Sequence, residues 1–492
     1  MTETQNVVVP ALPQSRAAAA PEAPAVDDDR LSLTNREFES AVATAARRLR
    51  DAGVGPGGVV GVLLPNRVEL VVALFAAWRL GAAVTPVNPA LADQEAEFQI
   101  RDAGVRVLVT DSEVSIPDVS LITCDELLAA SSGAADPVSV SGTDLALLIY
   151  TAGTTGTPKG VMITHGNIDA MTATFVDHFQ FTDAEHSLLV LPLFHANGVV
   201  LGVLSPLRAG GCATIVGRFR PEQFFPAVEK HRPTYFSAVP AIYAMLSALP
   251  DDVVPDTGSL RFGICGAAPM PTDLIERFET RFQVPIVEGY GLSETTTASA
   301  INPLVGLRKP GTVGPPLPGQ RIRIVDHELN DVEPGQTGEV LIAGDVVMAG
   351  YLNRPEATAD TIVDGWLRTG DVGRLDEDGY LQLVDRVKDM IIRGGENIYP
   401  KEIEAQIYHN DGVFEAAVIG RPHDVLGEIP VAYLSLREGA TVTPSEIEAD
   451  LKQRLALIKV PVEITVLDDV PKNPVGKIDK PALRRLDAAR TK

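Results

Sequence analysis

Short apolar runs alternate with longer amphipathic or apolar stretches along much of the chain, and this alternation constrains the fold more than any other feature. The runs at 58–65, 105–110 and 212–217 have the length and composition of buried strands. The stretch at 68–82 has the length and apolar content of a helix. Strand and helix in alternation predict an α/β fold with a largely parallel sheet and helices on both faces. In such sheets, ligands bind beyond the carboxyl ends of the strands.

The length of the chain and changes in its local composition predict more than one domain. With 492 residues, the chain is too long for one ordinary core. Residues 310–320 are dense in proline and glycine, and the short alternating runs after them indicate a small β subdomain. A compact α/β segment follows a second change within 385–388. We expect a large N-terminal domain over 30–385 and a small C-terminal domain over 386–492, preceded by a disordered tail over 1–29, which is polar and rich in alanine and proline.

Three helix starts can be predicted from capping chemistry. Thr34 with Glu37, and Thr443 with Glu446, have the spacing of the N-cap and N3 positions of a capping box. Pro400 has the fixed φ that suits a first helical position.

Composition argues against several classes of function. A formal charge of −23 disfavours nonspecific binding to nucleic acid and docking on anionic membranes. Three widely spaced cysteines suit a reducing compartment, and no two of the eight histidines have metal-ligand spacing. The longest apolar run, 70–78, is too short to span a bilayer, and the N-terminus does not have the pattern of a signal peptide. We therefore expect a cytoplasmic protein.

Residues 150–160, YTAGTTGTPKG, have the ingredients of a phosphate-binding loop. The segment is not the common P-loop, because Gly160 stands where a Ser or Thr would bind Mg²⁺. Its glycines let successive backbone N–H groups point at one anion, and threonine hydroxyls and a lysine add donors. The run at 144–150 predicts a strand before it. Taken alone, the loop leaves phosphate binding and a flexible surface turn equally open.

Five further segments follow in a recognisable order: GICGAAP at 263–269, EGYGLSE at 288–294, GWLRTGD at 365–371, DRVKDMIIRGGENIYPKEIE at 385–404 and PKNPVGKI at 471–478. Together with 150–160, they resemble the adenylate-forming (ANL) superfamily, in its branch of AMP-forming acyl-CoA synthetases and fatty-acid–CoA ligases. The resemblance runs from about residue 30 to the end. It implies a large N-terminal domain of parallel α/β sheets with a small β subdomain, and a small mobile C-terminal α+β domain.

The resemblance also implies a reaction and a set of residues. A carboxylic acid is activated by Mg·ATP to an acyl-adenylate, pyrophosphate leaves, and the thiol of CoA then displaces AMP. Glu294 is expected to bind Mg²⁺, Asp371 to accept the ribose hydroxyls, Arg386 to assist near the ribose and phosphate, and Lys477 to bridge the carboxylate and the α-phosphate. The remaining ATP- and AMP-binding candidates are Thr151, Thr154, Thr155, Gly156 and Lys159 at the β- and γ-phosphates, Gly266, Ala267, Ala268 and Tyr290 at the adenine, and Glu288, Gly289, Gly291 and Ser293 in the adenine motif.

Two positions depart mildly from the commoner family pattern. Ala152 stands where many members carry serine, and Ser293 stands where threonine is usual. Ala152 removes one hydroxyl from the loop, whereas Ser293 keeps a hydroxyl before the motif glutamate, so neither departure puts the ATP site in doubt.

The resemblance favours CoA as acceptor. Gly394 and Gly395 resemble the CoA-binding turn of acyl-CoA synthetases, and Lys388 stands at the expected hinge. Rotation about this hinge would exchange Lys477, needed for adenylation, for Gly395, needed for thioester formation.

The acid is less well defined. The stretch LPLFHAN at 191–197 contains no acidic residue to pair a substrate amine, which disfavours amino acids. Gly289 stands where malonyl-CoA synthetases carry arginine, and Thr297 where oxalyl-CoA synthetases carry histidine, although 301–314 somewhat resembles the latter. An uncharged short-to-medium fatty acid or aryl acid is therefore preferred. The acyl-pocket candidates are His195, also a catalytic candidate, Val239, Gly266 and Thr295.

Rival interpretations remain open. They are a dicarboxylate (oxalate-like) CoA ligase, an acyl-AMP ligase that loads a carrier protein, and a non-catalytic binding protein. The expected partners are ATP, CoA and a carboxylic acid, with no nucleic acid and no integral membrane association. The oligomeric state is left open, a homodimer included.

Overall fold

A computed structural model describes residues 8–130, 135–151, 158–386, 389–394, 396–423, 425–472 and 478–490. The chain divides into two compact units. Unit 1 comprises Met1–Ile322, Leu341–Arg368 and Asp378–Leu381, and unit 2 comprises Arg323–Val340, Thr369–Glu377 and Gln382–Lys492. Unit 2 therefore combines the C-terminal part of the chain with two earlier segments.

One sheet of unit 1 has seven strands in the order β17-β8-β7-β4-β3-β5-β6. The strands are β3 Val59–Leu63, β4 Ala83–Pro86, β5 Val107–Thr110, β6 Ser120–Ile122, β7 Leu145–Thr151, β8 Lys159–Thr164 and β17 Gly350–Tyr351. Pairing is parallel from β7 to β6 and antiparallel for β7–β8 and β8–β17. The strands predicted at 58–65 and 105–110 are confirmed. The segment 144–150 also forms a strand, but it leads into an antiparallel hairpin and not into a strand–helix crossover.

The other sheet of unit 1 has eight strands in the order β14-β13-β12-β11-β9-β10-β1-β2. The strands are β1 Pro24–Asp27, β2 Ser32–Thr34, β9 His186–Leu189, β10 Cys212–Ile215, β11 Tyr235–Ala238, β12 Phe262–Cys265, β13 Ile286–Tyr290 and β14 Ala300–Ile301. All pairings from β13 to β1 are parallel, and the two edge pairings are antiparallel. The parallel sheet predicted from the alternating pattern is thus confirmed, including the strand at 212–217.

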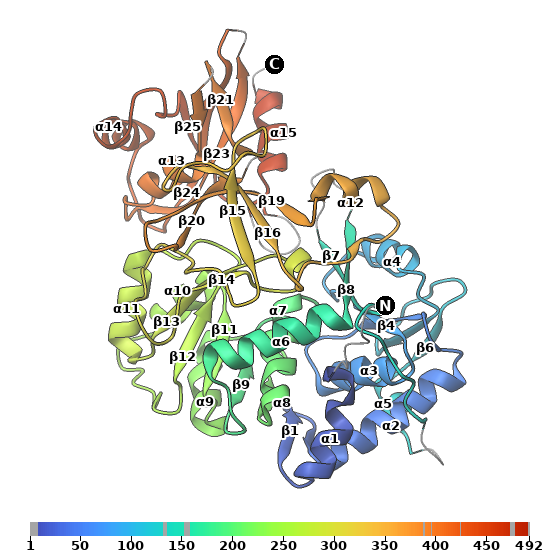
Figure 1. The fold of residues 1–492 in the computed structure, drawn as a ribbon. Coiled ribbons are helices and arrows are strands. Elements are labelled where there is room, and N and C mark those ends of the chain that lie inside the picture. Colours follow the sequence, from blue (N-terminus) through green and yellow to red (C-terminus); the bar gives the residue numbers. More distant parts are fainter. Residues whose placement is uncertain are drawn as a thin grey trace. The chain divides into compact units, whose positions relative to one another are not determined.

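Helices pack between and around these two sheets. They are η1 Val9–Ala11, α1 Leu12–Ala19, α2 Asn35–Asp51, α3 Val68–Arg79, α4 Asp93–Asp102, α5 Cys124–Leu128, α6 His165–Phe179, α7 Ala196–Val199, the π-helix η2 Val200–Leu204, α8 Ser205–Ala209, α9 Pro221–His231, α10 Pro240–Ser247, α11 Thr272–Phe282, η3 Ser293–Thr295 and α12 Pro355–Thr361. In Figure 1, α6 crosses unit 1 with β9 and β11 on one side and β4 and β7 on the other.

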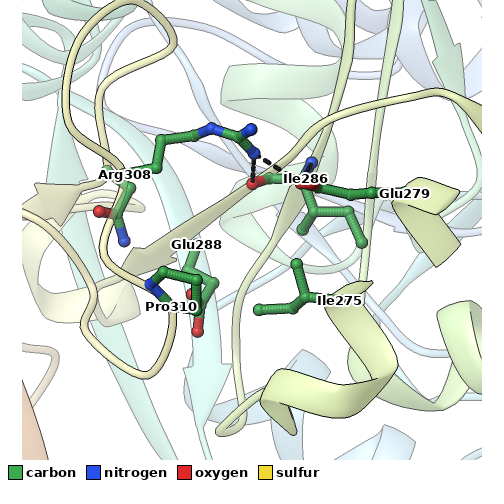
Figure 2. Close-up of a pocket in the computed structure, with 7 residues that line it drawn as sticks. Ile275, Glu279, Ile286, Glu288, Arg308 and Pro310 are labelled. Carbon is green, nitrogen blue, oxygen red and sulfur yellow. Dashed lines mark hydrogen bonds and ion pairs between the residues drawn. The ribbon is translucent and has the colours of Figure 1, made fainter. Parts of the chain in front are cut away.

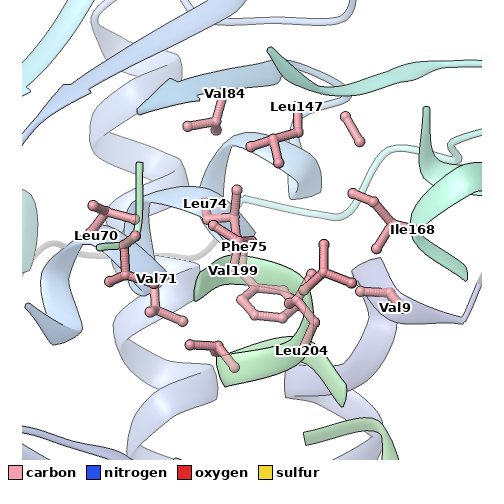
Figure 3. Packing of buried hydrophobic residues seen from close by; sticks show 14 of the residues in the cluster. Val9, Leu70, Val71, Leu74, Phe75, Val84, Leu147, Ile168, Val199 and Leu204 are labelled. Atoms are coloured by element: carbon pink, nitrogen blue, oxygen red, sulfur yellow. The ribbon is translucent and has the colours of Figure 1, made fainter. Parts of the chain in front are cut away.

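One large apolar core joins the two sheets. Phe75 of α3 packs with Val199 and Leu204, and Ile168 of α6 belongs to the same cluster (Figure 3). Trp78, one turn further along α3, is fully buried, and its indole N–H donates to the carbonyl oxygen of Ala146 at 2.8 Å. α3 is apolar on all sides because it is buried on all sides.

The N-terminal segment differs from its predicted disordered state. Residues 8–29 form η1, α1 and β1, and Val9 and Leu12 enter the large core. Arg16 is buried, and its guanidinium donates to Asn35 Oδ1 at 2.9 Å and to three backbone carbonyl oxygens. Val9, Leu12 and Arg16 supply the apolar contacts and charge-assisted hydrogen bonds that order the segment. The alanine-rich composition of the segment as a whole does not indicate the importance of these few side chains.

The predicted helix caps are confirmed. The Thr34 side chain accepts from the Glu37 N–H, Glu37 bonds back to Thr34, and α2 follows. Thr443 and Glu446 form the same reciprocal pair.

A third sheet, in the order β15-β16-β19-β18 with β20 beside β19, lies in the part of the sequence for which a small β subdomain is predicted. Its strands are β15 Arg321–Val325, β16 Gly338–Ala343, β18 Ile362–Val363, β19 Trp366–Leu375 and β20 Leu381–Arg386.

The C-terminal part of unit 2 is built on a fourth sheet in the order β22-β21-β24-β23, with β25 beside β24. Its elements are β21 Ile391–Arg393, β22 Glu396–Ile398, α13 Pro400–Ile407, β23 Val413–His423, β24 Gly427–Leu436, α14 Pro444–Arg454, β25 Glu463–Val466 and α15 Lys480–Arg490. α13 begins at Pro400 as predicted, and it covers a core that includes Ile391 and Val418. No helix in the described ranges is long and apolar enough to cross a membrane.

Candidate active site

Four parallel strands of the eight-stranded sheet end at the same edge. Ser237 of β11 pairs with Leu189 of β9, and Ala238 of β11 pairs with Cys265 of β12. Cys265 in turn pairs with Glu288 of β13. The segments that leave the carboxyl ends of these strands are therefore neighbours, as the sequence predicts for a binding site in a parallel sheet.

The turn after β12 approaches β13 closely. The Gly266 N–H donates to the carbonyl oxygen of Ala238 at 3.4 Å, and a Cβ on Gly266 would lie 3.3 Å from the Gly289 carbonyl oxygen. Ala267 has a φ of +69°, a conformation that residues with a Cβ rarely adopt. Ala267 and Ala268 are exposed. The structure thus brings Gly266, its neighbour Gly289 and the start of the segment at Val239 to one place.

The chain after β13 turns back sharply. A Cβ on Gly291 would lie 2.4 Å from the Ala298 Cα and from the Thr297 carbonyl oxygen, so only glycine fits without a shift. The preceding residue, Tyr290, is 8% exposed, and its carbonyl oxygen accepts the Ser299 N–H at 2.7 Å. This compact turn fixes the direction of the chain between β13 and η3.

η3 contains three of the predicted site residues. Ser293 and Glu294 are half-buried, whereas Thr295 is fully buried. The Thr295 hydroxyl accepts the Leu292 N–H at 3.1 Å. The structure gives Thr295 a local role in the turn, while the carboxylate of Glu294 keeps access to solvent.

The two ends of the predicted phosphate loop are held together. Thr151, the last residue of β7, pairs directly with Lys159, the first residue of β8. Both side chains are half-buried. The residues that flank the loop therefore belong to one antiparallel strand pair of the seven-stranded sheet.

Lys159 and Glu294 both contact the side chain of Tyr351. The Tyr351 hydroxyl donates to Glu294 Oε1 at 2.9 Å, and Lys159 Nζ lies 4.7 Å from the centroid of the Tyr351 ring. Pairing of β17 with β8 places Tyr351 opposite Val161. Burial is the largest cause, and the Glu294 charge the next, of a Tyr351 pKa raised well above its usual value, so the phenol stays protonated.

Sequence reasoning missed Tyr351. The residue belongs to a two-residue strand whose pairing with β8 spans almost two hundred positions of the chain. The only local signal is the glycine before it: Gly350 has a φ of +138°, which marks a constrained backbone position.

Glu288, in β13, lines a small cavity of mixed polar and apolar character. The cavity has a volume of about 80 Å³ and also contacts Glu279, Arg308 and Asn302 (Figure 2). Arg308 donates to Glu279 at 2.5 Å and to the Ile286 carbonyl oxygen at 2.9 Å. Burial raises the pKa of the Glu288 carboxyl to about 7, opposed by a hydrogen bond from the Gly311 N–H. Glu288 thus braces the segment that follows β14.

His195 is the N-cap residue of α7. Its ring lies 4.7 Å from that of Phe194, with the two planes tilted by 58°. The segment before it leaves β9, and Leu193 is tied to Asn66, whose Oδ1 accepts the Leu193 N–H at 2.9 Å. His195 is therefore held on the segment that follows the carboxyl end of β9.

Asp371 and Gly394 are described within unit 2. Asp371 lies in β19, is 5% exposed, and its N–H donates to Thr369 Oγ1 at 3.0 Å. Gly394 has a φ of +61°, and its N–H donates to the Leu426 carbonyl oxygen at 2.7 Å. The Asp371 backbone is thus held by a residue of its own strand, and that of Gly394 by a segment distant in the chain.

Several predicted positions lie outside the described residues. They are Thr154, Thr155, Gly156, Lys388, Gly395, Lys477 and the side chain of Arg386.

The described part of the chain contains no cluster of three or more histidine, cysteine, aspartate or glutamate side chains that could hold a metal by themselves. Glu294 offers one carboxylate. A single carboxylate does fit Mg²⁺, which usually binds through one or two carboxylates, waters and the phosphates of its substrate.

Comparison with known families gives two matches. A family model described as AMP-binding enzyme matches residues 13–352. A second model, described as AMP-binding enzyme C-terminal domain, matches residues 402–477.

Individual relatives match over nearly the whole chain. A feruloyl-CoA synthase from Amycolatopsis sp is 37% identical over 96% of this chain and 98% of its own. An oxalate–CoA ligase from Arabidopsis thaliana is 35% identical over 92% and 93%. Among solved structures, ATP-bound MatB from Rhodopseudomonas palustris has a TM-score of 0.90 at 30% identity, covering 97% of this chain and 98% of that one. O-succinylbenzoate CoA synthetase from Bacillus subtilis, in complex with ATP and a magnesium ion, has a TM-score of 0.86 at 32% identity, covering 95% and 98%.

Proposed function

This chain belongs to the AMP-binding enzyme family, and we infer from that membership that it is an AMP-forming acid–thiol ligase of the acyl-CoA synthetase branch. The proposed reaction has two steps. A carboxylate oxygen attacks the α-phosphorus of ATP, the bond to the pyrophosphate oxygen breaks, and an acyl-adenylate forms. The thiolate of CoA then attacks the acyl carbon, and AMP leaves with the bonding electrons.

One observation carries the proposal. Lys159, which follows the glycine–threonine segment, lies against the ring of Tyr351, and Glu294 at the end of the adenine motif accepts from the hydroxyl of the same residue. A cation suited to phosphate oxygens and a carboxylate suited to a metal are thus held close together without pairing to each other. Such a pair suits Mg·ATP, in which metal and polyphosphate arrive together.

The remaining nucleotide contacts follow from the neighbouring turns. Gly266 and Gly289 let the ends of β12 and β13 lie close together, and Tyr290 offers an aromatic ring for the adenine. We assign Asp371 to the ribose hydroxyls, because a carboxylate can accept both. Mg²⁺, bound through Glu294 and the phosphates, would offset negative charge on the leaving pyrophosphate.

The assignments in the C-terminal part rest on the family resemblance. Lys477 is assigned to the substrate carboxylate and α-phosphate, Arg386 to the ribose and phosphate, and Gly394 with Gly395 to CoA. We propose a domain boundary within 385–388, with Lys388 as the hinge. The positive φ of Gly394 supports a backbone turn that a long, narrow ligand could pass closely.

We propose an acid with an uncharged tail. An arginine at position 289 would recognise a distal carboxylate, but a Cβ on Gly289 would already lie 3.1 Å from Ile301 Cγ1. A larger side chain there requires the Ile301 side chain to shift. Phe194 and His195 offer an aromatic wall beside the strand ends, which suits an aryl acid. The relatives include both an aryl acid ligase and an oxalate ligase, so oxalate is the alternative to be tested.

The test is a panel of carboxylic acids supplied with Mg·ATP, with and without CoA. The panel contains cinnamic-type aryl acids, fatty acids of increasing length, oxalate and malonate. We expect pyrophosphate release with uncharged acids, and AMP formation on repeated turnover only when CoA is present. Turnover with oxalate alone would overturn the substrate class. Adenylate formation without any CoA-dependent turnover would indicate a carrier-protein ligase, and no pyrophosphate release with any acid would contradict the enzyme assignment.

A further inference from the structure

We propose that Tyr351 is a positioning residue for adenylation: its ring keeps Lys159 and Glu294 apart, and its hydroxyl directs the Glu294 carboxylate toward the metal of Mg·ATP. The inference rests on the proposed function, because it takes Glu294 as the carboxylate that meets Mg²⁺. Nothing in the motifs of the sequence points to Tyr351.

The contacts of Tyr351 are of two kinds. Its hydroxyl lies 2.9 Å from Glu294 Oε1, and the ammonium of Lys159 lies 4.7 Å from the ring centroid. One oxygen of Glu294 is thus occupied. The other, Oε2, has no hydrogen-bond partner within the described ranges and is available to a cation.

Separation of the two charges is useful for binding Mg·ATP. A lysine and a glutamate in direct contact satisfy each other, and each would have to be released before it could bind phosphate or metal. A phenol placed between them holds the lysine through the face of its ring and the glutamate through its hydroxyl. Both charged groups then stay ordered and available.

The backbone fixes Tyr351 at this place. A Cβ on Gly350 would lie 2.7 Å from Thr358 Cγ2, and the Tyr351 N–H donates to Thr358 Oγ1 at 2.9 Å. The next N–H, that of Leu352, donates to the Gly160 carbonyl oxygen at 2.8 Å. The backbone of Tyr351 is therefore tied to the strand that carries Lys159.

The chain contains a matched control in unit 1. Tyr380 is 8% exposed, as is Tyr351, and Lys309 Nζ lies 4.5 Å from its ring centroid. Its hydroxyl donates to a backbone carbonyl oxygen, that of Leu307, at 2.6 Å. Loss of the Tyr380 hydroxyl removes a similar contact that involves no candidate metal ligand.

The experiment measures binding and does not require the acid. Thermal unfolding of the full chain is followed at fixed ATP while Mg²⁺ is titrated, and the Mg²⁺ concentration at half of the maximal stabilisation is recorded. We expect Tyr351→Phe to raise this concentration about tenfold, as for a lost hydrogen bond to a charged group. Tyr351→Leu, which also removes the ring between the charges, should raise it further, and Tyr380→Phe should leave it unchanged.

A double substitution separates positioning from a purely structural effect. Glu294→Gln alone should raise the Mg²⁺ requirement, because an amide lacks the charge that a hard cation prefers. If Tyr351 acts through Glu294, Tyr351→Phe should add little in the Glu294→Gln background. Full additivity, or an unchanged Mg²⁺ requirement in Tyr351→Phe, would overturn the inference. A wild-type chain that Mg·ATP does not stabilise would instead contradict the proposed function.

Discussion

Glu288 is a buried carboxyl group whose surroundings oppose its charge. Burial in the cavity beside β13 raises its pKa from 4.5 to about 7, and the nearby Glu279 adds to the rise. The folded chain therefore binds this proton more tightly than the unfolded chain does. Between pH 4.5 and pH 7, the folded state holds more protons, so this group's contribution to stability falls as the pH rises.

Glu288→Gln should remove this pH dependence. The amide keeps an acceptor for the Gly311 N–H but has no charge to bury. Relative to wild type, the variant should gain stability from pH 5 to pH 8 by up to about 3 kcal/mol. Thermal unfolding without ligands at the two pH values measures the gain, with the exposed Glu356→Gln as control. An equal difference between wild type and variant at both pH values would show that Glu288 is not buried as a proton-binding group.

Lys477→Ala should separate the two half-reactions. Its proposed role is to stabilise charge that develops at the carboxylate and α-phosphate during the first attack. Loss of such a charge typically slows a reaction by about a hundredfold or more. We expect pyrophosphate exchange to collapse while thioester formation from supplied acyl-AMP continues. Equal losses in both assays would contradict the assignment.

At the scale of elements, the sequence predicts what local chemistry determines. Thr34 and Glu37 are three residues apart, so their capping box could be foreseen. The antiparallel pairing of β7 with β8 could not be predicted, because the loop sequence does not indicate whether the next strand runs parallel or antiparallel. The same limit hides the contacts of Tyr351, whereas Lys159 and Glu294 are proposed as site residues from their motifs. Tyr351 acquires its role only when β17 pairs with β8, a contact between distant segments that neither encodes alone.

The turn after β13 depends on glycine at position 291. In Gly291→Ala, the new methyl group would meet backbone atoms of Thr297 and Ala298 at 2.4 Å. We expect a loss of about 1–3 kcal/mol in the free energy of unfolding, as for other overpacked sites, because backbone cannot move aside as a side chain can. Urea unfolding measures the loss. Gly55→Ala is the control, because a Cβ there has nothing within 4 Å. Similar midpoints for the two variants would show that the turn can relax.

At the scale of the whole molecule, one active site has to serve two nucleophiles in turn. We propose that rotation at Lys388 exchanges the residues that serve each step. Proline fixes φ and removes a backbone donor, so Lys388→Pro should hold one arrangement. We expect pyrophosphate exchange to persist and CoA-dependent turnover to collapse. The control is Lys388→Ala, which removes the same side chain without fixing φ. A proline at a second lysine such as Lys401 is unsuitable as a control, because it would disturb α13. If both rates in Lys388→Pro remain near those of wild type, the hinge lies elsewhere.

The position of Trp78 in the core has an optical consequence. The chain has two tryptophans, Trp78 and Trp366, and both lie in the segments of unit 1. All tryptophan emission therefore reports on unit 1, whereas far-ultraviolet circular dichroism reports on the backbone of both units. If the two units melt separately, the two spectroscopic transitions will not coincide. The fully buried indole of Trp78 thus gives the large unit its own fluorescent label, already present in the natural chain.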